Sequence, residues 1–139
     1  MSPFLLSIAL AGTLVTGDDI RITYNDDGLW NSDLEGKGLE VRNPLTASWV
    51  DVTYPITPWV AFTVEYDDAS GPRKFKVDTY TPVNDFTTLS TTDASTASRK
   101  IYQVRWQAGP VLLVRTEYWT TSGSSMAVFI TAHNTGTAT

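Results

Sequence analysis

The sequence predicts an all-β protein, an antiparallel β-sandwich of about eight strands. From residue 18 onward, apolar and polar residues alternate with a period of two over short stretches such as Ile20–Tyr24, which indicates strands with one buried face. Gly, Pro, Asn and Asp separate these stretches at short intervals, as is typical of sandwiches and barrels. After residue 17, no segment has apolar residues at helical spacing together with helix caps.

The predicted strands are residues 20–24, 39–42, 47–53, 58–66, 73–80, 101–107, 111–119 and 126–133. Most connections between them are too short for a crossover, so neighbouring strands are expected to run antiparallel. Residues 81–100, rich in Thr, Ser and Asp, are predicted to form a long loop. The turn signal Asn134-Thr135-Gly136 and the residues 137–139 after it suggest that a further strand begins there, so the sandwich is expected to be incomplete at its C-terminus.

Composition narrows the class of protein. The length of 139 residues predicts one domain, and 42% hydrophobic with 18% charged residues is ordinary for a globular chain. There is no Cys, which excludes disulfides, thiolate zinc sites and thiol nucleophiles. The net charge of −5 and the scattered Lys and Arg residues argue against nucleic acids and anionic membranes as partners.

The N-terminus carries an apolar run from Phe4 to Thr16. This run is too short to span a bilayer, which needs about 20 apolar residues, but it suits the central region of a secretory signal. We therefore expect residues 1–17 to be a signal segment cleaved before Asp18, residues 18–139 to form the sandwich, and the protein to be secreted or held at the cell surface. The alternative is that residues 4–16 form a buried strand or helix of the domain.

No catalytic motif is recognisable. His133 is the only histidine, which excludes multi-histidine metal sites, and the sequence has no Gly-x-Ser-x-Gly elbow and no phosphate-binding glycine loop. Carboxylates occur within several predicted strands, but every soluble sandwich carries such residues. The sequence therefore favours a non-catalytic protein.

Two sets of residues are candidates for binding. Strand parity places Trp49 and Trp59 on mainly polar faces together with Asp51 and Glu65, and flat indoles beside carboxylates can stack on sugar rings. The alternative is that both tryptophans pack beneath loops or against other strands. The second set is a pair of acidic turns, Asp26-Asp27 and Asp67-Asp68, whose hard oxygen ligands suit Ca²⁺. Asp and Asn also close turns without metal, and no cofactor other than this calcium is predicted.

Two segments resemble known families. Residues 126–139 (MAVFITAHNTGTAT) resemble the strand–NTG–strand hairpin of immunoglobulin-like modules of bacterial surface proteins. Residues 104–119 (VRWQAGPVLLVRTEYW) resemble hairpins in the large sandwich domains of carbohydrate-active enzymes. The first resemblance implies a sandwich module of a surface protein, and neither resemblance implies a role for any single residue.

Three functions follow from these observations. The leading one is a non-catalytic extracellular binding or adhesion module that recognises a polysaccharide or a cell-surface protein. The second is the N-terminal accessory part of a larger carbohydrate-active enzyme. The third is a structural or assembly subunit that is completed by a strand from a neighbour.

Overall fold

The computed structural model describes residues 12–30, 38–52, 61–78 and 83–136, and within them every regular element is a strand. The part of the chain that is described holds no helix long and apolar enough to cross a membrane. The all-β prediction is confirmed, and the strands form three antiparallel sheets.

The first sheet has the order β1-β2-β3-β4 and contains β1 (Thr13–Thr16), β2 (Ile20–Tyr24), β3 (Leu39–Arg42) and β4 (Trp49–Asp51). The second has the order β5-β6-β7 and contains β5 (Ala61–Asp68), β6 (Gly71–Asp78) and β7 (Val83–Asn84). The third has the order β11-β10-β9-β8 and contains β8 (Thr87–Asp93), β9 (Arg99–Ala108), β10 (Val111–Thr120) and β11 (Ala127–Asn134).

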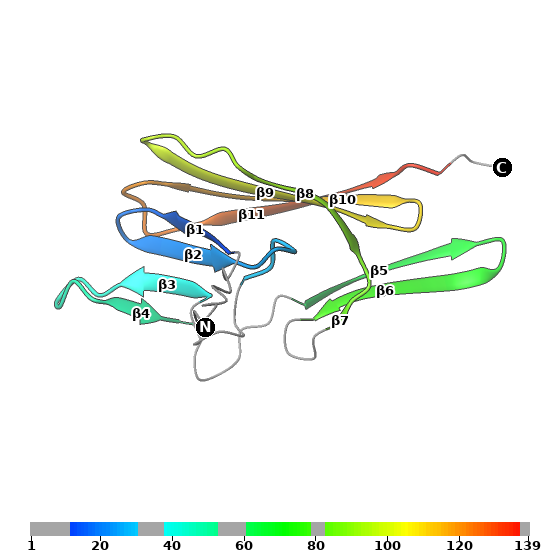
Figure 1. The fold of residues 1–139 in the computed structure, drawn as a ribbon, viewed down its shortest axis with the longest axis horizontal. Helices are drawn as coiled ribbons and strands as arrows, with labels where there is room; N and C mark the ends of the chain where they lie inside the picture. The colour runs from blue at the N-terminus through cyan, green and yellow to red at the C-terminus, as the bar shows by residue number, and fades with distance from the viewer. Residues whose placement is uncertain (1–11, 31–37, 53–60, 79–82, 137–139) are drawn as a thin grey trace, which may run out of the picture.

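The three sheets are arranged in two layers, as in a β-sandwich (Figure 1). The sheet β8–β11 forms one layer. The sheet β1–β4 lies against one half of it, and the sheet β5–β7 extends along the other half, towards the turn between β9 and β10. The strands β9 and β10, at ten residues each, are long enough to reach both smaller sheets.

The core lies between the layers and is rich in aromatic residues. The largest fully buried side chains are those of Trp106, Trp119, Tyr24 and Tyr102, and the rings of Tyr24 in β2 and Tyr102 in β9 stack with their centroids 3.6 Å apart. Alternation explains this placement, because Ile20, Ile22 and Tyr24 share the buried face of β2. Burial of each aromatic side chain removes roughly 150–250 Å² from water and supplies much of the driving force for folding.

Each of the eight predicted strand ranges overlaps an observed strand, and three further strands are present in the described residues. The prediction of a loop over residues 81–100 is wrong for β7 and β8. The Thr- and Ser-rich β8 is an edge strand whose side chains are mostly exposed, so it lacks the apolar residues that would have marked it. The predicted partner strand at residues 137–139 lies outside the described residues.

The third additional strand, β1, occupies the end of the segment that suits a secretory signal. Thr13–Thr16 pairs in register with β2, and Val15 is buried in the core. This is the strand arrangement that the sequence left as the alternative for residues 4–16. Export of the protein stays a prediction.

Candidate functional site

A groove of about 750 Å³ lies between β5 of one layer and β11 of the other. Its walls are Val64 to Ala69 at the end of β5, Pro110 and Val111 at the start of β10, and Ala132, Asn134 and Gly136 of β11 and its extension. Both β5 and β11 are edge strands of their sheets. The groove is therefore bordered by apolar side chains, carboxylates and two strand edges.

The β5–β6 hairpin forms one wall, and its turn is closed by Asp68. One carboxylate oxygen of Asp68 accepts a hydrogen bond from the Ser70 N–H at 2.7 Å, and the other accepts one from Arg73 Nε at 2.8 Å. The hydrogen bond from Arg73, followed by the one from Ser70, lowers the pKa of the Asp68 carboxyl. The hydrogen bond to Asp68, followed by its charge, raises the pKa of Arg73. Gly71, which follows the two turn residues and pairs with Asp68, has a positive φ of 106°, a conformation that glycine adopts without steric cost.

Aromatic contacts hold the hairpin against the large sheet. The rings of Tyr66 and Phe75 lie 5.8 Å apart, those of Phe75 and Phe86 6.4 Å apart, and those of Phe86 and Trp106 6.4 Å apart. This row leads from the groove into the core, where Trp106 is fully buried. Tyr66 also reaches the turn between β9 and β10, because a Cβ atom on Gly109 would overlap the Tyr66 hydroxyl. The groove is thus built on a packed interface.

Hydrogen bonds fix the opposite wall. The N–H and the hydroxyl of Thr135 both donate to the Pro110 carbonyl, at 2.6 and 2.8 Å. Gln107 Nε2 donates to the Gly109 carbonyl at 2.5 Å and lies 3.3 Å from Thr135 Oγ1. The chain beyond β11 therefore stays attached to the β9–β10 turn.

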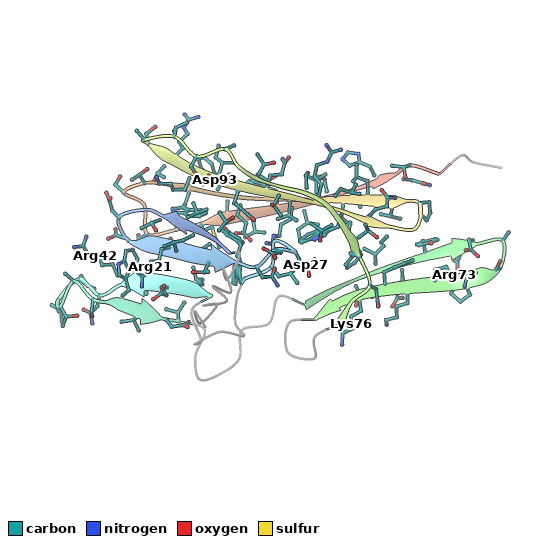
Figure 2. All side chains as sticks on the ribbon, in the orientation of Figure 1. Arg21, Asp27, Arg42, Arg73, Lys76 and Asp93 are labelled. Atoms are coloured by element: carbon teal, nitrogen blue, oxygen red, sulfur yellow. The ribbon has the colours of Figure 1, made fainter. Side chains whose placement is uncertain are left out.

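Three residues that the sequence singled out line this groove. They are Glu65, predicted as a ligand-binding residue, and Asp67 and Asp68, predicted as calcium ligands. Glu65 forms an exposed ion pair with Lys74 at 2.8 Å, and Arg73 and Lys76 lie on the same hairpin (Figure 2). The β11 wall was not predicted from the sequence, since the groove brings together residues of β5 and β11 that are far apart in the chain.

The other predicted ligand-binding residues lie elsewhere. Trp49 and Asp51 are half-buried in β4, on the first sheet, so the structure separates them from Glu65 in β5. The Arg21 guanidinium lies over the Trp49 ring, 4.6 Å from its centroid, and Arg21 also donates to both carboxylate oxygens of the buried Glu40. One face of the indole is therefore already occupied. Trp59 lies outside the described residues.

The strand β4 also shows why parity alone misjudges exposure. Trp49 and Asp51 do share a face, but Val50 and Val52 on the other face are 44% and 50% exposed. The row that runs across the sheet from Ile20 through Val41 to Val50 becomes progressively more exposed, because β4 lies beyond the cover of the opposing layer.

The first acidic turn has a structural role in the described fold. The Asn25 side chain accepts a hydrogen bond from the Leu29 N–H at 2.8 Å, and the Asp27 side chain accepts one from the Thr88 hydroxyl at 3.0 Å. The Asp27 carbonyl accepts a hydrogen bond from Trp106 Nε1. Within the ranges that the structure describes, no group of three or more His, Asp or Glu side chains is placed to hold a metal ion. Calcium binding by Asp26, Asp27, Asp67 and Asp68 stays a prediction.

A buried polar cluster that the sequence did not predict lies between the layers. Glu117 is 1% exposed, lies 3.1 Å from Arg115 Nε, and accepts hydrogen bonds from the Tyr24 hydroxyl and from Trp30 Nε1. Arg115 in turn donates to the Gly28 carbonyl. Burial, followed by the charge of Glu117, raises the pKa of Tyr24 far above its ordinary value. The cluster ties the turn after β2 to β10 and lies away from the groove.

Comparison of the chain with protein-family models, with curated proteins and with solved structures finds no match in any of the three.

Proposed function

We propose that this protein is a non-catalytic extracellular binding module and that the groove between β5 and β11 is its binding site. The groove is the observation that carries the proposal. Its volume of about 750 Å³ falls within the range of roughly 300–1,000 Å³ that is typical of ligand sites. Its apolar walls and its carboxylates supply the combination of buried area and oriented polar groups that binding sites use.

The shape of the site favours an extended ligand. The groove is lined by the C-terminal parts of two strands that are the edges of their sheets, so a chain molecule that lies along these strands would contact both walls. A polysaccharide and an extended segment of a cell-surface protein both meet this requirement. The apolar run from Phe4 to Thr16 supports export, which would bring the module to such ligands.

Filling the groove tests the proposal. Ala132 lies on the groove wall, whereas its neighbour Thr131 is exposed on the other face of β11. Binding is measured on arrays of defined glucose, mannose, galactose and N-acetylglucosamine oligomers and of extended peptides. For any probe that the parent protein binds, Ala132→Tyr is expected to weaken the affinity at least about tenfold, equivalent to about 1.4 kcal/mol. The matched control Thr131→Tyr is expected to keep the affinity of the parent protein. Full binding by Ala132→Tyr would show that the groove is not the site.

Trp49, which the sequence predicts as a ligand-binding residue, supplies a second comparison. If the groove is the binding site, Trp49→Ala should leave binding on the same arrays unchanged. The variant should lose about 1 kcal/mol of stability, because Arg21 loses the ring beneath its guanidinium. Loss of oligosaccharide binding in Trp49→Ala, with a retained melting temperature, would move the site to the face that carries Trp49 and Asp51.

A further inference from the structure

β11 presents an unpaired backbone edge. Its register with β10 has no irregularity, and the Thr135 N–H donates to the Pro110 carbonyl. Thr135 and Pro110 therefore form a hydrogen-bonded pair of the ladder. Because such pairs recur at every second residue of an antiparallel ladder, Thr131 and His133 also direct their backbone N–H and C=O groups towards β10. Ile130 and Ala132 therefore direct their N–H and C=O groups away from the sheet, as do Val128 and Asn134. In the described parts of the chain, no backbone hydrogen bond from outside the sheet reaches these groups.

This edge lacks the features that protect the other edges. β8, at the opposite edge of the same sheet, has an irregular register between Thr88 and Ser90 and ends in Asp93. β1 and β4 are only four and three residues long, and β5 carries three carboxylates. β11 is eight residues long, and its sequence AVFITAHN has no Lys, Arg, Asp, Glu or Pro. Bulges, short length and charge are the usual means by which proteins prevent strand addition, so β11 is open to it.

The side chains of β11 are equally unprotected. Val128 and Ile130 share the inner face with Arg115 and Glu117 of β10, yet they are 45% and 52% exposed. Phe129, on the outer face, is 59% exposed. A strand added beside β11 would bury part of these side chains and pair the free backbone groups at the same time.

Charge identifies the kind of strand. Ala132 and Asn134, at the C-terminal end of β11, line the groove together with Glu65, Asp67 and Asp68. Lys74 pairs with Glu65 and Arg73 with Asp68, and within the described residues no cation pairs with Asp67. The lining of the groove therefore keeps one carboxylate, that of Asp67, whose charge is not paired within the described part of the chain. A second copy of the chain carries the same net charge of −5, which disfavours self-pairing, whereas a basic strand is attracted.

We propose that β11 accepts an added antiparallel strand from a partner protein, with Lys or Arg where the strand enters the groove and apolar residues at alternate positions beside Ile130 and Val128. This inference rests on the proposed function and names the ligand of the same site. The free donors and acceptors of β11 recur at every second residue, and another strand matches this spacing along its whole length. Directly opposed residues share a face, so the basic and apolar positions of the partner all point inwards.

The probe is the synthetic peptide KTKTVTV, titrated against the intact chain by fluorescence anisotropy. Its two lysines align with Asn134 and Ala132, and its two valines align with Ile130 and Val128. N-methylation of the first valine removes a donor directed at β11 and is expected to weaken binding by at least about tenfold. N-methylation of the second threonine, which points away from β11, is the matched control and should change affinity by less than about twofold. The peptide ETETVTV should bind at least about tenfold more weakly, and this difference should shrink as salt is raised.

These measurements use an unaltered protein, so no result depends on whether a variant folds. Absence of binding by KTKTVTV at millimolar concentration, equal binding of the two N-methylated peptides, or equal binding of ETETVTV would each overturn the inference. A stable dimer of the chain alone in sedimentation, not dissociated by KTKTVTV, would identify a second copy as the occupant and overturn it as well. Oligosaccharide binding that Ala132→Tyr abolishes, without peptide binding, would leave the proposed function standing and remove only the added strand.

Discussion

At the scale of single residues, the fold depends on one buried ion pair of β10, Arg115 and Glu117, whose carboxylate accepts hydrogen bonds from distant parts of the chain. Glu117 on β10 meets Tyr24 of β2, 93 residues earlier, and Trp30, 87 residues earlier. A buried carboxylate is costly unless its oxygens are bonded, and here Arg115 supplies the opposite charge while Tyr24 and Trp30 supply donors. The sequence shows both charges on β10 but gives no sign that they are buried, because Arg and Glu are almost always exposed.

This arrangement predicts an unequal response to two changes. Glu117→Ala should cost about 3–5 kcal/mol of unfolding free energy, because it leaves the Arg115 charge buried without its partner. Replacing both charges with apolar side chains, Arg115→Met together with Glu117→Leu, should cost clearly less, since no uncompensated charge remains. Urea unfolding of the two variants and the parent provides the comparison. An equal loss in both variants would mean that packing, and not charge compensation, sets the contribution of Glu117.

At the scale of elements, the sequence predicts strands well where an apolar face is present and poorly where it is not. Strands such as β2 and β10 alternate clearly between buried and partly exposed residues, and their ranges were predicted to within one residue at each end. β8 escaped prediction because an exposed edge strand needs no apolar face. β1 lies within an apolar run that suits a secretory signal, and local composition does not distinguish a signal from a buried strand.

The strand β1 supplies the prediction at this scale. Its pairing with β2 and the burial of Val15 predict that a chain beginning at Asp18 is less stable than one beginning at Gly12. The loss of the buried valine alone is worth roughly 1.5–3 kcal/mol. Denaturant unfolding of the two chains measures the difference, and N-terminal sequencing of exported protein shows which form exists outside the cell. Equal stability of the two chains would show that β1 is dispensable, as cleavage before Asp18 requires.

At the scale of the whole molecule, the arrangement of the sheets is set by contacts that no local pattern reveals. The period-two alternation predicted an antiparallel sandwich, but not that two smaller sheets share one layer, nor that β5 and β11 border a groove. Three acidic residues of that groove were predicted as candidates from local features, Glu65 from strand parity and Asp67 and Asp68 from their acidic turn, and all three lie close together in β5. The β11 wall depends on the hairpin docking against the β9–β10 turn, where Tyr66 meets Gly109.

That docking contact gives the last prediction. Ala at position 109 should cost about 1–2 kcal/mol for its positive φ of 57°, and more in the parent protein because its Cβ would overlap Tyr66. In a Tyr66→Leu background the overlap disappears, so Gly109→Ala should there cost only the backbone contribution. A double-mutant cycle from urea unfolding of the four proteins is expected to give a coupling of about 1–3 kcal/mol. Amide hydrogen exchange in β5 and β6 should also accelerate in Gly109→Ala, because the contact between the β5–β6 hairpin and the large sheet is weakened. Costs that add to within about 0.5 kcal/mol would show that the hairpin is held by the aromatic row alone.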